Sequence, residues 1–173
     1  MGGRCEAPQP AYRGVTSAGR TAAAEGIYIE LDVAKCWPSL MMHLAVAAGI
    51  TAPCLFEYAR TADAGKEVLQ GLTAFYCVMG RDVATAAIKK AINSFAMGGG
   101  VPAELKPAPG WLWEYKAEVD RIREASVAAF LQFLQWARGV HPKRSEDRLR
   151  TSAFARLLQA LEDASLFVAR DSC

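Results

Sequence analysis

Hydrophobic and polar residues alternate strictly over one short stretch near the beginning of the chain. Residues 27–33 place aliphatic side chains on one face and Tyr28, Glu30 and Asp32 on the other. Such alternation over four to eight residues is typical of a half-buried β-strand. We therefore predict a strand over residues 27–33, and it is the only strand that the pattern predicts.

After this strand the apolar positions recur every three or four residues, which is typical of amphipathic helices. Leu40 and Leu44 follow Pro38 at this spacing, and Gly49 ends the run. Further helices are predicted over about 53–61, over the segment that contains Val68, Leu72 and Phe75, and over about 80–97, before three consecutive glycines. A long helix from Trp111 to Arg138 and a last helix with apolar residues from Leu149 to Val168 complete the pattern.

These elements predict an α+β fold that is predominantly α-helical, in which one strand precedes a helical region. Residues 1–26 are rich in Gly, Ala, Pro, Ser and Thr without a sustained period, so we expect a flexible lead-in there and a single domain over residues 27–173.

The composition is that of a folded protein without a strong overall charge. Hydrophobic residues make up 52% of the 173 residues, and the net charge is only +2. The five cysteines are scattered and contain no Cys-x-x-Cys pair, which favours reduced thiols over a zinc site or a disulfide framework. No apolar run reaches the length of about 18 residues that spans a bilayer. We therefore expect a soluble protein of the cytoplasm or nucleus that does not engage a membrane.

The end of the predicted strand carries the first candidate chemistry. Glu30 and Asp32 lie on the same face, about 7 Å apart along the strand. A carboxylate at a strand end suits a hard cation such as Mg²⁺, which takes few protein ligands and leaves positions for phosphate oxygens. The alternative is that both carboxylates form the solvated face of an edge strand.

The spacing Asp32-x4-Trp37-Pro38-Ser39 resembles motif A of template-directed DNA polymerases. In that family the acid that closes a palm strand holds the catalytic metals, and an aromatic residue before Pro-Ser lies under the sugar of the incoming nucleotide. The resemblance implies that Asp32 is the catalytic and metal-binding residue and that Trp37 excludes a 2′-hydroxyl. The alternative for Trp37 is a core aromatic that packs at the start of a helix.

The helix predicted over 80–97 resembles motif B of the same polymerases in two competing registers. In the family B register, Lys89, Asn93 and Ser94 match in order, whereas in the family A register Arg81 matches and Thr85 stands in the place of a lysine. A cation on this helix would neutralise charge on a triphosphate. The alternative is that the lysines form the solvated face of an amphipathic helix.

The order of motifs over about residues 20–170 resembles polymerase-like proteins of large DNA viruses and mobile elements. Besides Asp32 and the helix, the matching residues are Gly49-Ile50, Pro53-Cys54-Leu55 with Tyr58, and Arg81-Asp82-Val83-Ala84. The resemblance implies an incomplete polymerase palm followed by a fingers-like region, with Arg81, Lys89 and Asn93 on the nucleotide side. Asp32 and the cationic helix are then expected to share one cleft.

The same resemblance predicts the function and its limits. We expect a DNA polymerase-like nucleotidyltransferase fragment that binds Mg²⁺ or Mn²⁺ and a deoxynucleoside triphosphate, with primer–template DNA and the remaining polymerase segments as partners. No second acid matches motif C, since Asp171-Ser172 lacks the first aspartate of that motif, so we expect the chain alone to be inactive.

Two other functions remain open from the residues. The chain can be a helical scaffold without catalysis, in which the helix from Trp111 to Arg138 offers a partner surface. It can also be a basic module that binds nucleic acid, built on a cluster that Glu146 and Asp147 interrupt. The cations of that cluster are Arg138, Lys143, Arg144, Arg148 and Arg150.

Overall fold

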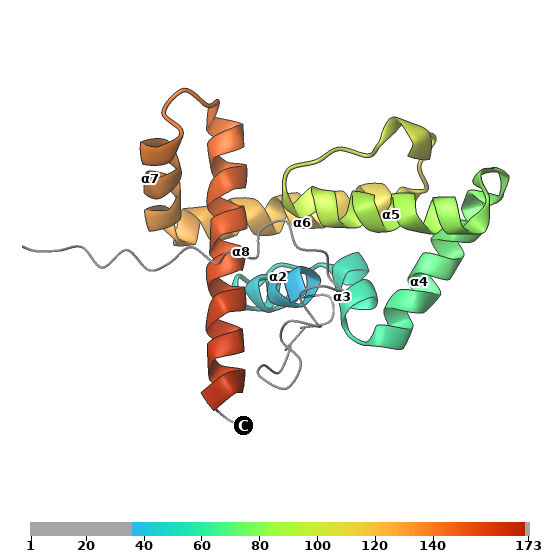
Figure 1. The fold of residues 1–173 in the computed structure, drawn as a ribbon, viewed down its shortest axis with the longest axis horizontal. Coiled ribbons are helices and arrows are strands. Elements are labelled where there is room, and N and C mark those ends of the chain that lie inside the picture. The colour runs from blue at the N-terminus through green and yellow to red at the C-terminus, as the bar shows by residue number, and fades with distance from the viewer. Residues whose placement is uncertain (1–35, 172–173) are drawn as a thin grey trace, which may run out of the picture. The chain divides into compact units, whose positions relative to one another are not determined.

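The computed structural model describes residues 36–171, which belong to one compact unit, Val33–Cys173. Seven α-helices and two short 3₁₀ helices form this part of the chain (Figure 1). In order they are α2 (Cys36–Ala47), α3 (Pro53–Ala59), α4 (Ala62–Phe75), η1 (Cys77–Met79), α5 (Arg81–Ala96), η2 (Ala103–Leu105), α6 (Gly110–Ala129), α7 (Leu131–Val140) and α8 (Glu146–Asp171).

The predicted α+β class with a palm-like strand is wrong for this fold. Between residues 36 and 171 the regular structure is entirely helical, with no strand or sheet. The helices bury their apolar faces against one another, so this core forms without a sheet to pack on. The strand predicted over 27–33 and the lead-in predicted over 1–26 lie outside the described residues.

Several predicted helices are confirmed with bounds close to those expected. The helix expected over about 80–97 is α5, and the one expected over 53–61 is α3. The run after Pro38 is α2, and Gly49 follows its end with a positive φ of 64°. Glycine adopts this left-handed conformation without the steric penalty of a side chain, which explains why the helix ends there.

The single helix predicted from Trp111 to Arg138 is wrong, because the chain breaks at Phe130. This residue has φ −116° and ψ 61°, outside the helical region, and it separates α6 from α7. Figure 1 shows α7 leaving the line of α6 to run beside α8. No glycine or proline marks the break, and the half-buried Phe130 instead packs against the core.

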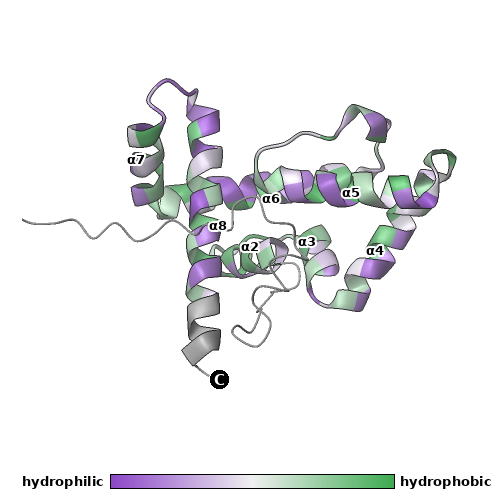
Figure 2. Cartoon of the chain, in the orientation of Figure 1, coloured by the Kyte–Doolittle hydropathy of each residue, from purple (hydrophilic) through white to green (hydrophobic). Residues whose placement is uncertain are grey.

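Helix α6 is the centre of the core. Its Tyr115 is fully buried and contacts three other aromatic rings, those of Tyr58, Phe95 and Trp111, at centroid distances of 6.0, 6.2 and 5.1 Å. The edge-on contact with Tyr58 joins α6 to α3, and a tilted contact with Phe95 joins it to α5, while Trp111 stacks on Tyr115 within α6. Figure 2 shows hydrophobic residues predominating on α2, and hydrophilic ones on the turn between α7 and α8.

The start of α3 is held by a buried carboxylate from α6. Glu118 is only 3% exposed, and it accepts hydrogen bonds from the backbone N–H groups of Cys54 and Leu55 at 3.1 and 2.8 Å. The first N–H groups of a helix have no partner within the helix, so an acceptor from elsewhere satisfies them. Glu118 therefore ties α3 to α6 over more than sixty residues of sequence.

The glycine turn after α5 brings α5 against α8. The N–H of Gly99 bonds to the carbonyl of Ser94, and that of Gly98 to the carbonyl of Phe95, which is the Schellman arrangement. Gly98 has φ 71°, and a Cβ on it would lie 2.7 Å from Oγ1 of Thr151 on α8. The glycine turn that ends α5 is therefore also the point where the end of α5 closely approaches α8.

Within residues 36–171, no helix combines the length and the apolar character that crossing a bilayer requires.

Candidate nucleotide-binding site

The start of α2 and the end of α5 line one open hollow of about 530 Å³. This volume falls within the range of about 300–1,000 Å³ that is usual for small-molecule sites. Two residues of the lining, Trp37 and Asn93, come from the two separate polymerase-like motifs, 56 positions apart in sequence. The complete lining is Cys36, Trp37, Pro38, Asn93, Ser94 and Met97.

The indole of Trp37 is fixed by α8. Its Nε1–H donates to Oε2 of Glu162 at 3.2 Å, and Nε2 of Gln159 donates to the same oxygen at 3.3 Å. The ring is half-buried and packs against the core, while part of it lines the hollow. Trp37 therefore packs at the start of a helix and also lines the hollow, and its role in excluding a 2′-hydroxyl stays a prediction.

Asn93 provides the polar side of the hollow. Its side chain is exposed, and it has no hydrogen-bond partner among residues 36–171, so its amide can both donate to and accept from a ligand. Lys89 precedes it by four residues on α5, which places the two on the same helix face, about 6 Å apart along the axis. Lys89 is exposed and likewise has no ion-pair partner in the described part of the chain.

Arg81 and Thr85 face a different part of the molecule. Arg81 lines a second hollow, of about 360 Å³, together with Gln70, Thr73 and Ala74 of α4. The hydroxyl of Thr85 lies 2.8 Å from the Arg81 carbonyl and 3.0 Å from Oγ1 of Thr73. The two competing registers of motif B therefore correspond to the two ends of α5, since Arg81 lies at its start beside α4 and Asn93 lies near its end at the Trp37 hollow.

The described residues do not build a metal site by themselves. No group of three His, Cys, Asp or Glu side chains comes together between residues 36 and 171. The carboxylate tied to the hollow is Glu162, which already accepts the Trp37 N–H. Asp32, the predicted catalytic and metal-binding residue, lies outside the described residues, four positions before Cys36 in sequence.

Sequence reasoning missed Glu162 and Gln159, which hold Trp37 in place. Both lie in the middle of α8, on a helix whose register was predicted only from its apolar residues. Their polar side chains carry no local signal for this site. Glu162 accepts from Trp37, 125 positions away in sequence, and Gln159 donates to Glu162. Only the crossing of α8 over the start of α2 makes them part of this site.

The segment predicted as a scaffold surface is buried on one face and exposed on the other. In α6 eight residues are buried, including Leu112, Val119 and Val127, and the helix contacts α2, α3, α5, α7 and α8. Trp113, Leu131 and Trp136 of the same segment are exposed, so the scaffold function stays a prediction.

Comparisons with protein-family models, with curated proteins and with solved structures found no match for this chain.

Proposed function

We propose that the chain is the nucleotide-binding part of a DNA polymerase-like protein and that the hollow between α2 and α5 takes a deoxynucleoside triphosphate. One observation carries this proposal. Trp37 and Asn93, which the polymerase resemblance assigns to the same nucleotide, line the same hollow although they are far apart in sequence. A shared site is required for this function, because reacting groups must be brought together in one geometry.

The chemistry of the hollow fits such a ligand. The flat indole of Trp37 offers an apolar wall for the sugar, and the Asn93 amide offers hydrogen bonds. Lys89, one turn earlier on α5, supplies a positive charge for the phosphates. Asp32 is the ligand that we propose for Mg²⁺ or Mn²⁺, on the sequence resemblance alone, and we derive no chemical step from it.

The proposal is tested by measuring the binding of dATP with Mg²⁺ to purified variants of the full chain. Asn93→Ala should weaken binding about 3- to 10-fold, because one or two hydrogen bonds are lost. Lys89→Ala should weaken it about tenfold, because a charge-assisted contact is lost. Lys90→Ala is the matched control, since this exposed lysine points about 100° away around the helix and should leave binding unchanged.

Trp37→Ala tests the role of the indole beyond packing. It should weaken dATP binding and also reduce the preference for dATP over ATP, since the wall that excludes a 2′-hydroxyl is removed. Trp113→Ala removes an exposed tryptophan outside the hollow and should change neither quantity. Circular dichroism of each variant reports whether it is folded.

Two outcomes would contradict the proposed function. The first is that the parent chain does not bind dATP at millimolar concentration. The second is that Lys89→Ala and Lys90→Ala weaken binding equally. Arg81→Ala distinguishes the two registers, because Arg81 lines the other hollow and its loss should have little effect. We expect no primer extension by residues 1–173, because the resemblance matches no second acid.

A further inference from the structure

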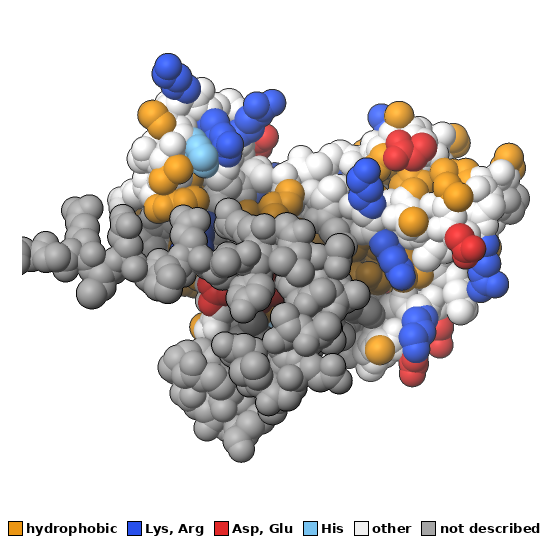
Figure 3. Space-filling view, in the orientation of Figure 1, with side chains coloured by type: hydrophobic (Ala, Val, Ile, Leu, Met, Phe, Trp, Pro, Cys, Tyr) orange, Lys and Arg blue, Asp and Glu red, His pale blue; other side chains and the backbone are white. Residues whose placement is uncertain are grey.

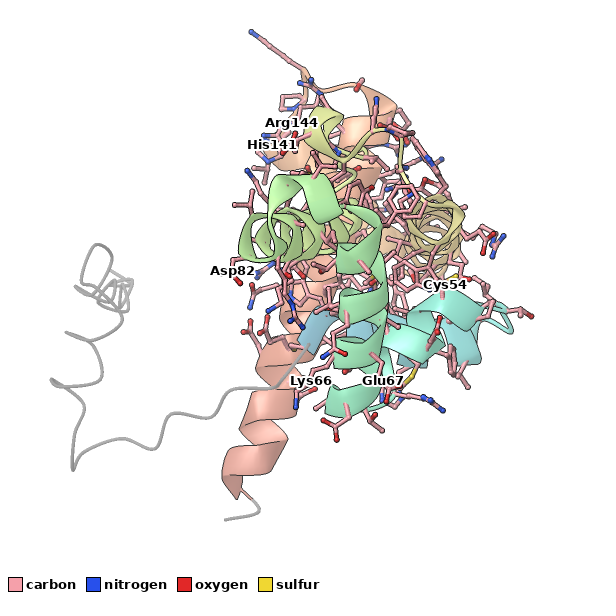
Figure 4. The ribbon with its side chains drawn as sticks, turned by 90° about the vertical axis from the view of Figure 1, so that its right-hand side faces the viewer. Cys54, Lys66, Glu67, Asp82, His141 and Arg144 are labelled. Carbon is pink, nitrogen blue, oxygen red and sulfur yellow. The ribbon has the colours of Figure 1, made fainter. Side chains whose placement is uncertain are left out.

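Positive side chains gather where α7 turns into α8. Figure 3 shows blue side chains over this end of the molecule, and Figure 4 shows His141 and Arg144 together at the turn. We call this region the α7–α8 surface and define it by Trp136, Lys143, Arg144, Arg148 and Arg156, all of which are exposed.

Two arginines of the same stretch are already neutralised by acids. Arg138 pairs with Glu146 at 2.8 Å, and Arg150 pairs with Glu124 at 2.6 Å. Arg150 also lies 3.6 Å from Glu146. The basic cluster seen in the sequence therefore divides, and these two arginines form ion pairs that link α6, α7 and α8.

The other cations are left to face solvent. Lys143 and Arg148 have no ion-pair partner among residues 36–171, and Arg144 donates to the hydroxyl of Ser152 at 2.9 Å, which leaves its charge uncompensated. Asp147 is the exposed acid between them, and it too has no ion pair in that part of the chain. The cations therefore outnumber the unpaired acid in a segment of six residues.

An exposed aromatic ring adjoins these charges. Trp136 is 42% exposed, Cζ of Arg156 lies 5.9 Å from the centre of its ring, and the His141 ring meets it edge-on at 6.4 Å. Lys and Arg side chains beside an exposed aromatic ring are the usual components of a surface that binds nucleic acid, since cations contact phosphates and the ring stacks on a base.

The α7–α8 surface is also connected to the edge of the nucleotide hollow. Thr151 of α8 packs on Gly98, the residue that follows Met97 of the hollow. Arg148 precedes Thr151 by three residues, so the two are neighbours on the surface of α8. A strand of nucleic acid along the cations would therefore pass close to the glycine turn after α5.

We propose that the α7–α8 surface binds the phosphate backbone of primer–template DNA, with Trp136 against an unpaired base of the template. Charge complementarity and the aromatic ring carry this inference. The positions of the cations and of Trp136 do not depend on whether the hollow binds a nucleotide. Only the identity of the nucleic acid as primer–template DNA rests on the proposed function.

The test measures binding of the full chain to a fluorescent primer–template duplex with a single-stranded overhang, by anisotropy over a range of KCl concentrations. Lys143→Ala combined with Arg148→Ala should weaken binding about tenfold or more at low salt. It should also reduce the slope of log K against log[salt] by about 2, since each lost phosphate contact contributes about 0.9. Both side chains are exposed and lie outside the hydrophobic core, so this double variant should fold like the parent chain.

The control removes the same charge elsewhere. Arg60→Ala combined with Lys66→Ala changes two exposed cations near α4, and Figure 4 shows Lys66 at the opposite end from Arg144. This variant should retain both the affinity and the salt slope. An equal loss in the two double variants would overturn the proposal, because binding would then follow net charge and not this surface.

Further outcomes separate this inference from its alternatives. Trp136→Ala should weaken binding to the overhang DNA more than to a blunt duplex, and equal weakening would remove the base contact from the proposal. Stronger binding to vesicles of anionic lipid than to DNA, lost in the Lys143→Ala and Arg148→Ala variant, would overturn it in favour of a membrane surface. The Lys143→Ala and Arg148→Ala variant should bind dATP like the parent chain. DNA binding by the α7–α8 surface and dATP binding by the hollow are therefore tested separately.

Discussion

Two glutamates, Glu118 in the core and Glu146 at the α7–α8 surface, show how differently the same side chain acts in the two regions. Glu118 is almost completely buried and accepts two backbone N–H groups of α3. Glu146 is 47% exposed at its side chain and pairs with Arg138 and Arg150. Glu118 lies in the interior, and Glu146 lies at the surface between two arginines.

The comparison indicates where stability and binding reside in this protein. A buried carboxylate with hydrogen-bond partners is costly to remove, because its partners are left unsatisfied away from water. An exposed ion pair contributes little, because water and salt screen it. We therefore expect the α3–α6 region to determine folding and the α7–α8 surface to remain available for ligands.

The largest effect is expected at Cys54, in the interior beside Glu118 and Glu114. Burial, together with these two carboxylates, raises the pKa of the Cys54 thiol from 9.0 to about 12. The thiolate at pH 8 should be about 1000-fold scarcer than at an ordinary cysteine. Alkylation of Cys54 by iodoacetamide, followed by peptide mass spectrometry, should be at least 100-fold slower in the native chain than in guanidinium chloride. Similar rates in the two states would contradict a buried thiol.

The same shift predicts the pH dependence of stability. Because the pKa is raised on folding, the neutral thiol is favoured in the folded state, and its contribution is fully present below about pH 9. It should be lost as the pH rises from about 9 towards 12. Urea unfolding of Cys54→Ala and of the parent chain should be compared over this pH range. The free energy of unfolding should decline less steeply with pH in the variant.

Glu118→Ala should produce the next largest effect. Two backbone N–H groups of α3 lose their acceptor and a space opens beside α6, so we expect a loss of about 2–4 kcal/mol in the free energy of unfolding. Glu118→Gln keeps one carbonyl oxygen and should lose less. Glu67→Ala, at an exposed position labelled in Figure 4, is the control and should lie within about 0.5 kcal/mol of the parent. Equal losses in the free energy of unfolding for Glu118→Ala and Glu67→Ala would contradict the expected difference between interior and surface.

Gly98→Ala tests the contact between the glycine turn and α8. A Cβ at this position meets Oγ1 of Thr151 at 2.7 Å, and the positive φ of 71° disfavours any L side chain. We expect a loss of about 1–3 kcal/mol, measured by urea unfolding. Gly100→Ala is the matched control, because nothing lies within 4 Å of its Cβ and its φ is not positive. A loss as large at Gly100 would show that general chain flexibility is responsible.

The smallest stability effect is expected for Glu146→Ala at the surface. It removes two exposed ion pairs, so stability should fall by less than about 1 kcal/mol. The same change should strengthen binding to primer–template DNA, because it removes a negative charge and releases Arg138. A large loss of stability with unchanged DNA binding would contradict the expectation that the α7–α8 surface serves binding and contributes little to folding.

Local signals in the sequence determined most of the helices. Pro38 lies in the first turn of α2, Gly49 and Gly98 follow helix ends in left-handed conformations, and Ala91 and Phe95 of the apolar pattern in α5 are buried. These features act over a few residues, since helix capping and amphipathic spacing depend only on near neighbours. The strand predicted over residues 27–33 came from equally local alternation, but it does not define the class of the fold, because the described helices form a core among themselves.

Tertiary structure decided the features that depend on distant residues. The break at Phe130 has no local signal and follows from the packing of α7 against α8. The pairing of Trp37 with Glu162, the cap that Glu118 places on α3 and the division of the basic cluster into paired and unpaired cations all join separate helices. Sequence alone suggested that Trp37 and Asn93 serve one nucleotide, but their place in one hollow depends on where the helical core positions α2 and α5. Such contacts depend on shape and burial across the whole core, which no short window of sequence contains.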